Sequence, residues 1–215
     1  MRFSPRSRPW AFDKNGMRYK VAKTAVIDPA IGSPEWERAE AAVVSVNRWK
    51  EYAPAPQTTV KILRGPEGIS LLMHTEETHL RMEHREENGE ICEDSCMEFF
   101  FKPNNLCPAY LNFECNPRGV LHLGMGSGRE NRVFPDVDRA LLSIQSVANE
   151  GDWSLKLYIP DSLLLELFGE ISRVAKANFY KCGDLTDHVH YAAWAEVETP
   201  EPDFHQPDFF GFLEL

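Results

Sequence analysis

The sequence predicts an all-β fold, a jelly-roll-like or immunoglobulin-like sandwich of two antiparallel sheets with one or two short helices. Stretches in which apolar and polar residues alternate recur roughly every ten residues, which is the strand spacing of a sandwich. Turn-forming residues separate these stretches, and only two short segments carry helix-start signals. Because the chain shows no repeat, low-complexity tract or linker, residues 19–215 are predicted to form one domain.

The first part of the chain predicts an arm, several strands and a helix. Residues 1–18 are basic and turn-rich, which predicts a loosely held N-terminal arm. A helix is predicted to begin after Ser33, because serine is a favoured N-cap and Pro34 suits the first helical position. Residues 76–93 are charged with little periodicity and are predicted to form a long exposed loop over one end of the sheets. Strands are predicted at residues 19–27, 43–49, 58–63 and 69–75.

The clearest alternation lies in residues 93–119, which predict two strands joined by a turn. Side chains alternate between the two faces of a sheet, so a period of two over seven or eight residues indicates one buried face. The apolar face is predicted to pack in the core, and it carries Met97, Phe99, Phe101, Leu111, Phe113 and Cys115. The opposite face is more polar, and it gathers Glu98, Tyr110, Asn112, Glu114 and Asn116.

The remaining chain predicts further strands and one more short helix. A helix is predicted at residues 160–169, and Gly169 is predicted to end it. Trp153 is predicted to face inward, because it opens an alternating apolar stretch. Strands are predicted at residues 120–125, 141–148, 152–159, 173–181 and 189–197.

Composition excludes several classes of partner. The 215-residue chain has a net charge of −10 and a pI near 5.2, which disfavours binding to a nucleic-acid backbone. No apolar run reaches the roughly 18 residues that a membrane span needs.

Five cysteines without metal-type CxxC pairs predict reduced thiols and a cytoplasmic protein. An extracellular protein is the alternative if an export signal lies outside this sequence. The oligomeric state is not predicted.

The polar face of the hairpin is the candidate binding site. Glu98 and Glu114 are predicted to project from the same face, where carboxylates accept hydrogen bonds from hydroxyls, hold calcium or act as an acid–base couple. The alternative is a solvated outer face with no ligand. Aromatic side chains near this face offer flat surfaces to a sugar ring. The candidate ligand-binding residues are Glu98, Glu114, Tyr180, Asn112, Tyr110, Trp49 and Phe204.

Several motifs occur in an order that resembles the family 9 carbohydrate-binding modules. DSCMEFF at residues 94–100 is similar to a strand of that family, and YLNFECNPRG at residues 110–119 is similar to the strand that follows. The resemblance extends through residues 153–160 and ends in FHQPDFFGFL at residues 204–213. The family is similar to the wider DOMON-type sandwiches, some of which bind sugars and some haem. The resemblance implies a sandwich fold and sugar binding without catalysis.

Matched by motif, the family's sugar-binding residues are only partly present in this chain. The resemblance places the family's hydrogen-bonding glutamate at Glu98 and its arginine at Glu114, which reverses the charge. It places a family glutamine at Tyr180. The two tryptophans that sandwich the sugar correspond to Cys92 and Phe204, so one stacking ring is lost. The resemblance therefore implies a saccharide or related small ligand without naming it.

Three other functions compete with a binding module. A carboxylate- or metal-dependent glycoside hydrolase could use the same face. Histidines could form a transition-metal site, although no third ligand is evident beside the HxH at residues 188–190. A haem site would need inward methionines such as Met73 and Met97, with His122 beside them. No cofactor is firmly implied, and structural calcium is the remaining metal hypothesis. The histidines considered are His74, His79, His84, His188 and His190.

Overall fold

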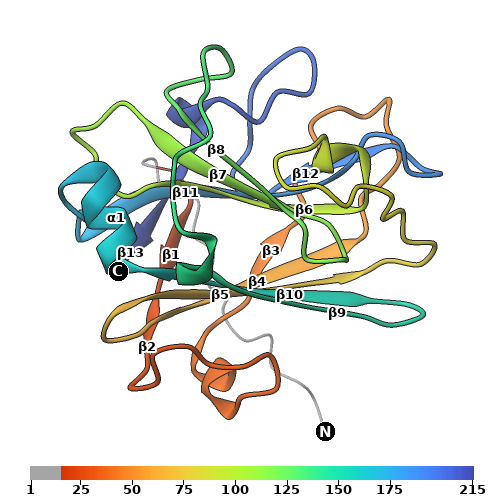
Figure 1. The fold of residues 1–215 in the computed structure, drawn as a ribbon. Helices are drawn as coiled ribbons and strands as arrows, with labels where there is room; N and C mark the ends of the chain where they lie inside the picture. Colours follow the sequence, from red (N-terminus) through yellow and green to blue (C-terminus); the bar gives the residue numbers. More distant parts are fainter. Residues whose placement is uncertain (1–15) are drawn as a thin grey trace, which may run out of the picture.

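The computed structural model describes residues 16–215, and most of the predicted arm, residues 1–15, lies outside this range. Two facing sheets form the molecule (Figure 1). The seven-stranded sheet has the order β1-β13-β11-β6-β7-β8, with β12 also paired to β11, and the six-stranded sheet has the order β2-β4-β5-β10-β9, with β3 paired to β4. The predicted β-sandwich is confirmed.

The strand bounds of each sheet are as follows. The seven-stranded sheet contains β1 (Arg18–Lys20), β6 (Cys96–Lys102), β7 (Tyr110–Cys115), β8 (Leu121–Gly126), β11 (Val174–Gly183), β12 (His190–Ala193) and β13 (Gly211–Glu214). The six-stranded sheet contains β2 (Ala22–Lys23), β3 (Ala42–Val44), β4 (Gln57–Arg64), β5 (Gly68–Glu76), β9 (Ser143–Ala148) and β10 (Trp153–Pro160).

Both sheets are mixed rather than purely antiparallel, because the first predicted strand is divided. The chain crosses from one sheet to the other at the buried residue Val21. β1 pairs parallel to β13 in one sheet, and β2 pairs parallel to β4 in the other. The alternation of residues 19–27 predicts extended backbone, but it does not reveal that two short segments join different sheets.

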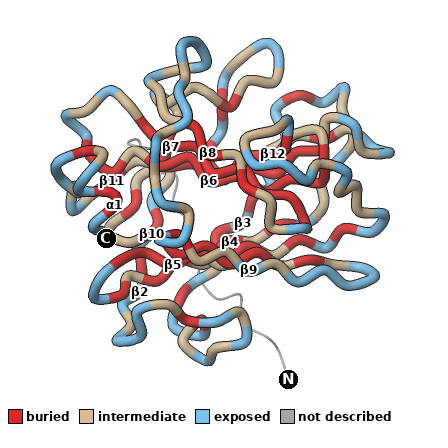
Figure 2. The backbone as a smooth tube through the Cα atoms, viewed as in Figure 1, coloured by how far each residue is buried: buried red, intermediate tan, exposed pale blue. Residues whose placement is uncertain are grey.

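The core between the sheets contains the predicted apolar faces. The Phe99 ring lies 5.2 Å from Phe101, 6.0 Å from Phe113 and 5.4 Å from Phe179, centroid to centroid. Figure 2 shows buried residues along the central strands of both sheets. Met73 and Met97 pack in this core, whereas the His122 ring hydrogen-bonds the Gly89 carbonyl at the opposite face of its sheet. These three side chains therefore do not converge as the haem hypothesis requires.

A second hydrophobic cluster covers the outer face of the seven-stranded sheet. It contains Phe100, Tyr110, Tyr180 and Phe204, together with side chains from the loops that cross this face. β6 and β7 are consequently buried on both faces, and their polar face is not the solvated surface that alternation alone allows. This second cluster surrounds the candidate site.

The helices are short. α1 (Asp161–Phe168) agrees with the prediction and ends at Gly169, whose φ of 71° suits glycine. The helix predicted after Ser33 is a 3-10 helix, η1 (Pro34–Arg38), and the Ser33 hydroxyl accepts a hydrogen bond from the Glu35 amide as an N-cap. The other 3-10 helices are η2 (Ile91–Glu93), η3 (Arg139–Leu141) and η4 (Pro207–Phe209). No helix within residues 16–215 is long and apolar enough to cross a membrane.

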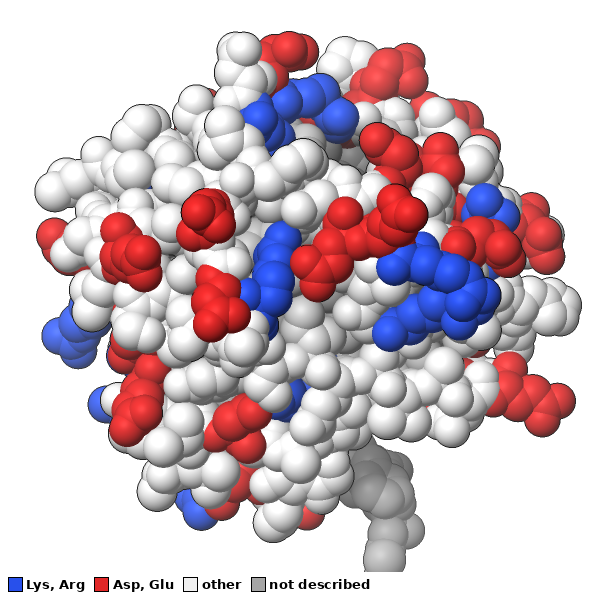
Figure 3. Space-filling model, viewed as in Figure 1, with Lys and Arg blue, Asp and Glu red and all other residues white. Residues whose placement is uncertain are grey.

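The charged loop at residues 76–93 is held against the seven-stranded sheet more firmly than predicted. The buried Asp94 carboxylate accepts hydrogen bonds from the Glu83 and His84 amides and from the Asn116 side chain at 2.9–3.0 Å. The charged tips are exposed, while Ile91 is buried. In Figure 3, acidic side chains are scattered over the face in view, and basic side chains form a few separate groups between them. The hydrogen bonds to Asp94 anchor the loop so that Cys92 lies beside the candidate site.

Close packing beside β13 gives a stability prediction. A Cβ atom at Gly211 would meet the Trp194 ring and lie 2.9 Å from the Met17 carbonyl oxygen. We expect Gly211→Ala to lower the free energy of unfolding by about 1–3 kcal/mol, because the buried backbone has no room to move away. Urea denaturation measures the change. Gly128→Ala is the control, since a Cβ atom there has nothing within 4 Å, and an equal loss in both variants would contradict the packing argument.

Candidate functional site

Strand pairing brings the two candidate carboxylates together. Glu98 on β6 and Glu114 on β7 are direct partners in the antiparallel register, so they share a face as predicted. Tyr180 on β11 is the partner of Glu98 on the other side. Both carboxylates are buried, with exposed fractions of 3% for Glu98 and 7% for Glu114. The predicted polar face is thus the floor of an enclosed site.

A pocket of about 220 Å³ opens above this floor. It is at the small end of ligand sites, which suits one ring or the end of a chain better than a long oligomer. The floor comes from β6, β7 and β11, and the walls come from β12 and from the segments around residues 92, 129 and 202–205. Its lining residues are Cys92, Glu98, Phe100, Glu114, Arg129, Cys182, Asp184, Tyr191, Pro202, Phe204 and His205.

The pocket concentrates acidic groups whose pKa values burial raises. Burial raises the pKa of Glu98 well above its usual value, and the neighbouring Glu114 raises it further. Burial likewise raises the pKa of Glu114 and of Asp184. Arg129 also lines the pocket, but its guanidinium pairs with Asp203 at 2.8 Å. The floor can therefore offer both protonated and ionised carboxyl groups to a ligand.

One wall of the pocket is an aromatic platform. The Phe204 ring stacks on Tyr180 with centroids 4.0 Å apart and an angle of 10° between the rings. The Tyr180 hydroxyl donates a hydrogen bond to the Phe204 carbonyl, and Trp49 packs on Phe204 at 6.0 Å. Tyr191 stands beside the same ring at 6.1 Å. These contacts fix the orientation of the Phe204 ring.

The structure separates the predicted site residues into two groups. Glu98, Glu114 and Phe204 line the pocket. Tyr110, Asn112, Tyr180 and Trp49 do not, because the second hydrophobic cluster and the overlying loops bury them behind the lining residues.

The buried group supports the lining residues through specific hydrogen bonds. Asn112 donates to Glu114 Oε1 at 2.7 Å, and the Tyr110 hydroxyl bonds His205 Nδ1 at 2.8 Å. Trp49 Nε1 donates to a carbonyl of the loop that precedes Phe204 at 3.0 Å. These buried side chains therefore hold the lining residues in position.

Sequence reasoning missed part of the lining. Arg129, Asp184 and Tyr191 lie in loops or at a strand beside the sheet edge, where no periodicity marks them. His205, which lies in the closing FHQPDFFGFL motif, bonds Tyr110 and also lines the pocket. Cys92 lies in the lining at a position where the family resemblance implies a stacking tryptophan. Two signals could have found lining residues: the family resemblance, which marks position 92, and the closing motif around His205.

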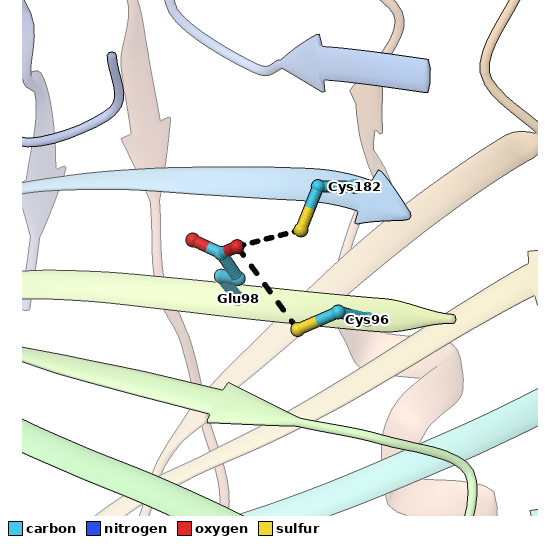
Figure 4. A group of neighbouring side chains, drawn as sticks. All are labelled: Cys96, Glu98 and Cys182. Carbon is cyan, nitrogen blue, oxygen red and sulfur yellow. Dashed lines mark hydrogen bonds between the residues drawn. The ribbon is translucent and has the colours of Figure 1, made fainter. Parts of the chain in front are cut away.

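Three of the five histidines considered as metal ligands have other partners. His74 bonds Ser154, His84 bonds Glu93, and His190 bonds Lys181. Among the described residues, one group of three metal-ligating side chains comes together, and it contains no histidine. That group is Cys96, Glu98 and Cys182, drawn in Figure 4.

Comparisons with known proteins agree with this fold. A family model for carbohydrate-binding family 9 matches residues 35–215. A candidate carbohydrate-binding protein from Bacteroides uniformis is 30% identical, covers 92% of this chain and 98% of its own, and superposes with a TM-score of 0.78. No curated protein that was compared matches the chain.

Two structures of a family 9 module from Caldicellulosiruptor kristjanssonii share the fold at much lower identity. The complex with cellotriose is 12% identical, with a TM-score of 0.64, and covers 92% of each chain. The complex with glucose is 10% identical, with a TM-score of 0.65, and covers 92% of this chain and 94% of that one. Since the family model matches well over half of its length, this chain belongs to carbohydrate-binding family 9.

Proposed function

We propose that this protein binds a saccharide without catalysis, in the pocket floored by Glu98 and Glu114. One observation carries the proposal: a fixed aromatic ring, Phe204, and two buried carboxyl groups face the same small pocket. Sugar recognition needs such a pairing, because the ring carbons of a sugar pack on an aromatic face while its hydroxyls require polar partners. Family membership supports the same function.

The carboxyl pair would recognise hydroxyl groups in two ways. An ionised carboxylate accepts hydrogen bonds from hydroxyls, whereas a protonated carboxyl can also donate one. The raised pKa values of Glu98 and Glu114 favour a proton on this pair, so it can supply both a donor and acceptors. Glucose and short cello-oligosaccharides are the first ligands to test, because related modules were solved with glucose and cellotriose.

The arrangement favours binding over glycoside hydrolysis. A hydrolase places its two carboxyl groups on either side of the scissile bond. Glu98 and Glu114 instead project side by side from neighbouring strands of the pocket floor. Asn112 also donates a hydrogen bond to Glu114, which fixes that carboxyl within the floor.

Several narrower expectations stay predictions. These are kinship with the DOMON-type sandwiches, a structural calcium ion, a single domain over residues 19–215 and a cytoplasmic location. Saccharide binding in the pocket requires none of them.

A thermal-shift screen against glucose, cello-oligosaccharides and other neutral sugars tests the proposal. A ligand at 100 times its Kd adds about 2.7 kcal/mol of stability, which raises the Tm of a protein of this size by roughly 5–10 °C. Glu98→Ala is expected to abolish the shift while changing the Tm of the free protein little. The exposed Glu201 provides the control, Glu201→Ala, which should keep the shift. The proposal fails if no sugar raises the Tm, or if Glu98→Ala binds as tightly as the wild type.

A further inference from the structure

Two thiols and a carboxylate meet at the base of the pocket. Cys96 and Glu98 lie on β6, and Cys182 lies opposite Cys96 on β11 (Figure 4). Glu98 Oε1 is 2.8 Å from Cys182 Sγ and 4.0 Å from Cys96 Sγ. All three ligand atoms lie within 4.8 Å of one another, and each side chain is at most 3% exposed.

We propose that Cys96, Glu98 and Cys182 form a binding site for a thiophilic divalent cation, with zinc as the metal that fits best. Around tetrahedral zinc, with Zn–S bonds of about 2.3 Å and Zn–O bonds of about 2.0–2.2 Å, neighbouring ligand atoms lie about 3.5–3.8 Å apart. The Glu98 oxygen lies 2.8 Å from one sulfur and 4.0 Å from the other, and no two ligand atoms are more than 4.8 Å apart. Side-chain shifts on the order of 1 Å would therefore bring the three atoms to the tetrahedral spacing.

The ligand types select against calcium. Calcium takes six to eight oxygen ligands, whereas this cluster offers two soft sulfur atoms and one carboxylate. Thiolates select zinc and other soft cations. The pairing of β6 with β11 holds the three side chains together. Cys96 and Cys182 are register partners on these strands, and Glu98 follows Cys96 by two residues on the same face of β6.

The fourth position of the metal would open into the pocket. Glu98 and Cys182 both line the pocket, while Cys96 lies fully buried beneath them. Three protein ligands with one open position is the arrangement of zinc sites that bind a water or a ligand oxygen. The metal could thus coordinate a hydroxyl of a bound saccharide, a refinement that rests on the proposed function, whereas metal binding itself does not.

Cobalt titration of the reduced, metal-stripped protein tests the site, because cobalt(II) reports thiolate coordination through its charge-transfer and d–d bands. We expect one cobalt ion per chain with tetrahedral thiolate bands, and displacement of those bands by one equivalent of zinc. Cys96→Ser and Cys182→Ser should each weaken cobalt binding by more than about 100-fold. The matched control is Cys107→Ser, since Cys107 is half-buried and packs beside the core between the sheets, and it should bind as the wild type.

Several results would overturn the site. One is the absence of thiolate bands, and another is bands that survive both Cys96→Ser and Cys182→Ser, which would mark adventitious binding to another thiol. Oxidation of Cys96 and Cys182 by air to a disulfide in place of metal binding, seen as the loss of the mass of two hydrogen atoms that persists in mild reductant, would also overturn it. If the serine variants unfold, the test is anomalous scattering from wild-type crystals grown with one equivalent of zinc. The proposal requires a zinc peak between the three side chains, and a peak elsewhere would overturn it.

The metal site and the saccharide site can each be rejected without rejecting the other. The thermal-shift screen is run both in chelator and with one equivalent of zinc. Sugar binding in chelator without any cobalt bands would leave the proposed function standing and reject the metal site. Cobalt bands without any sugar shift would reject the proposed function and leave the metal site standing.

Discussion

Lys181→Met is expected to lower the free energy of unfolding by about 3–5 kcal/mol, because it leaves a buried carboxylate without its cation. Lys181 lies on the inner face of β11 and is fully buried. Its Nζ atom lies 3.2 Å from Glu77 Oε2 and donates to His190 Nε2 at 3.0 Å. Glu77, 6% exposed, also accepts hydrogen bonds from Ser95 and Trp153 at 2.9 Å. Chemical denaturation at neutral pH measures the loss.

A second substitution separates charge from packing. In Lys181→Met/Glu77→Gln, the neutral amide can still accept hydrogen bonds, so we expect the double variant to recover most of the lost stability. Lys176→Met is the control on the same strand, because Lys176 is only half-buried and should change the unfolding free energy by less than about 1 kcal/mol. A double variant no more stable than Lys181→Met would show that packing, and not the unpaired charge, causes the loss.

Acidification is expected to destabilise the fold through two histidines held neutral, one buried and one half-buried. Burial and the charge of Lys181 lower the pKa of His190 to about 4. Its Nε2 atom faces the Lys181 ammonium and its Nδ1 atom faces the His188 carbonyl at 2.7 Å, which requires the Nδ1–H tautomer. Burial, followed by Arg132 and Arg129, lowers the pKa of His205 to about 3. Each histidine therefore favours the fold only while neutral.

The sign and the pH window follow from these pKa values. A histidine with a lowered pKa contributes stability that is complete above about pH 6.5 and is lost as pH falls towards its folded pKa. The loss is of the order of 3 kcal/mol for His190 between pH 6.5 and pH 4. The raised pKa values of Glu98, Glu114 and Asp184 act in the opposite direction, because their stabilising contribution is present in acid and lost as pH rises.

A variant isolates the histidine contribution from the opposing carboxyl groups. In His190→Gln, the side-chain oxygen can accept from Lys181 and the amide can donate to the His188 carbonyl. We expect the stability of this variant to improve relative to the wild type by about 3 kcal/mol as pH falls from 6.5 to 4. Urea denaturation across this pH range measures the difference, and a difference that does not change with pH would contradict the assignment of a neutral His190.

The sequence predicted the sandwich and the floor of the pocket well, because both depend on local periodicity. The alternation in residues 93–119 is sufficient to place Glu98 and Glu114 on one face, and the observed register makes them direct partners. The walls were not predictable in this way. Asp184, Arg129 and Tyr191 reach the pocket because distant loops and β12 fold over the outer face, and strand periodicity holds no information about which loop covers which strand.

The same limit explains why four candidate residues lie behind the lining. Tyr110, Asn112 and Tyr180 have the alternation of an outer face, and the sequence alone does not show that a second hydrophobic cluster buries that face. Trp49 is buried by the loop that follows β12. The metal-ligating cluster was missed for a different reason: Cys96 and Cys182 are 86 positions apart in sequence, and only the pairing of β6 with β11 brings them together.

The most direct test of the central claim is a two-dimensional 1H–15N NMR titration of the whole chain with glucose and cellotriose. Binding in the pocket predicts that the largest amide shifts cluster at Cys92, Cys182, Tyr191 and Phe204. Shifts that cluster instead at the separate cavity lined by Pro54, Glu77 and His188 would contradict the account, as would a spectrum that neither sugar changes.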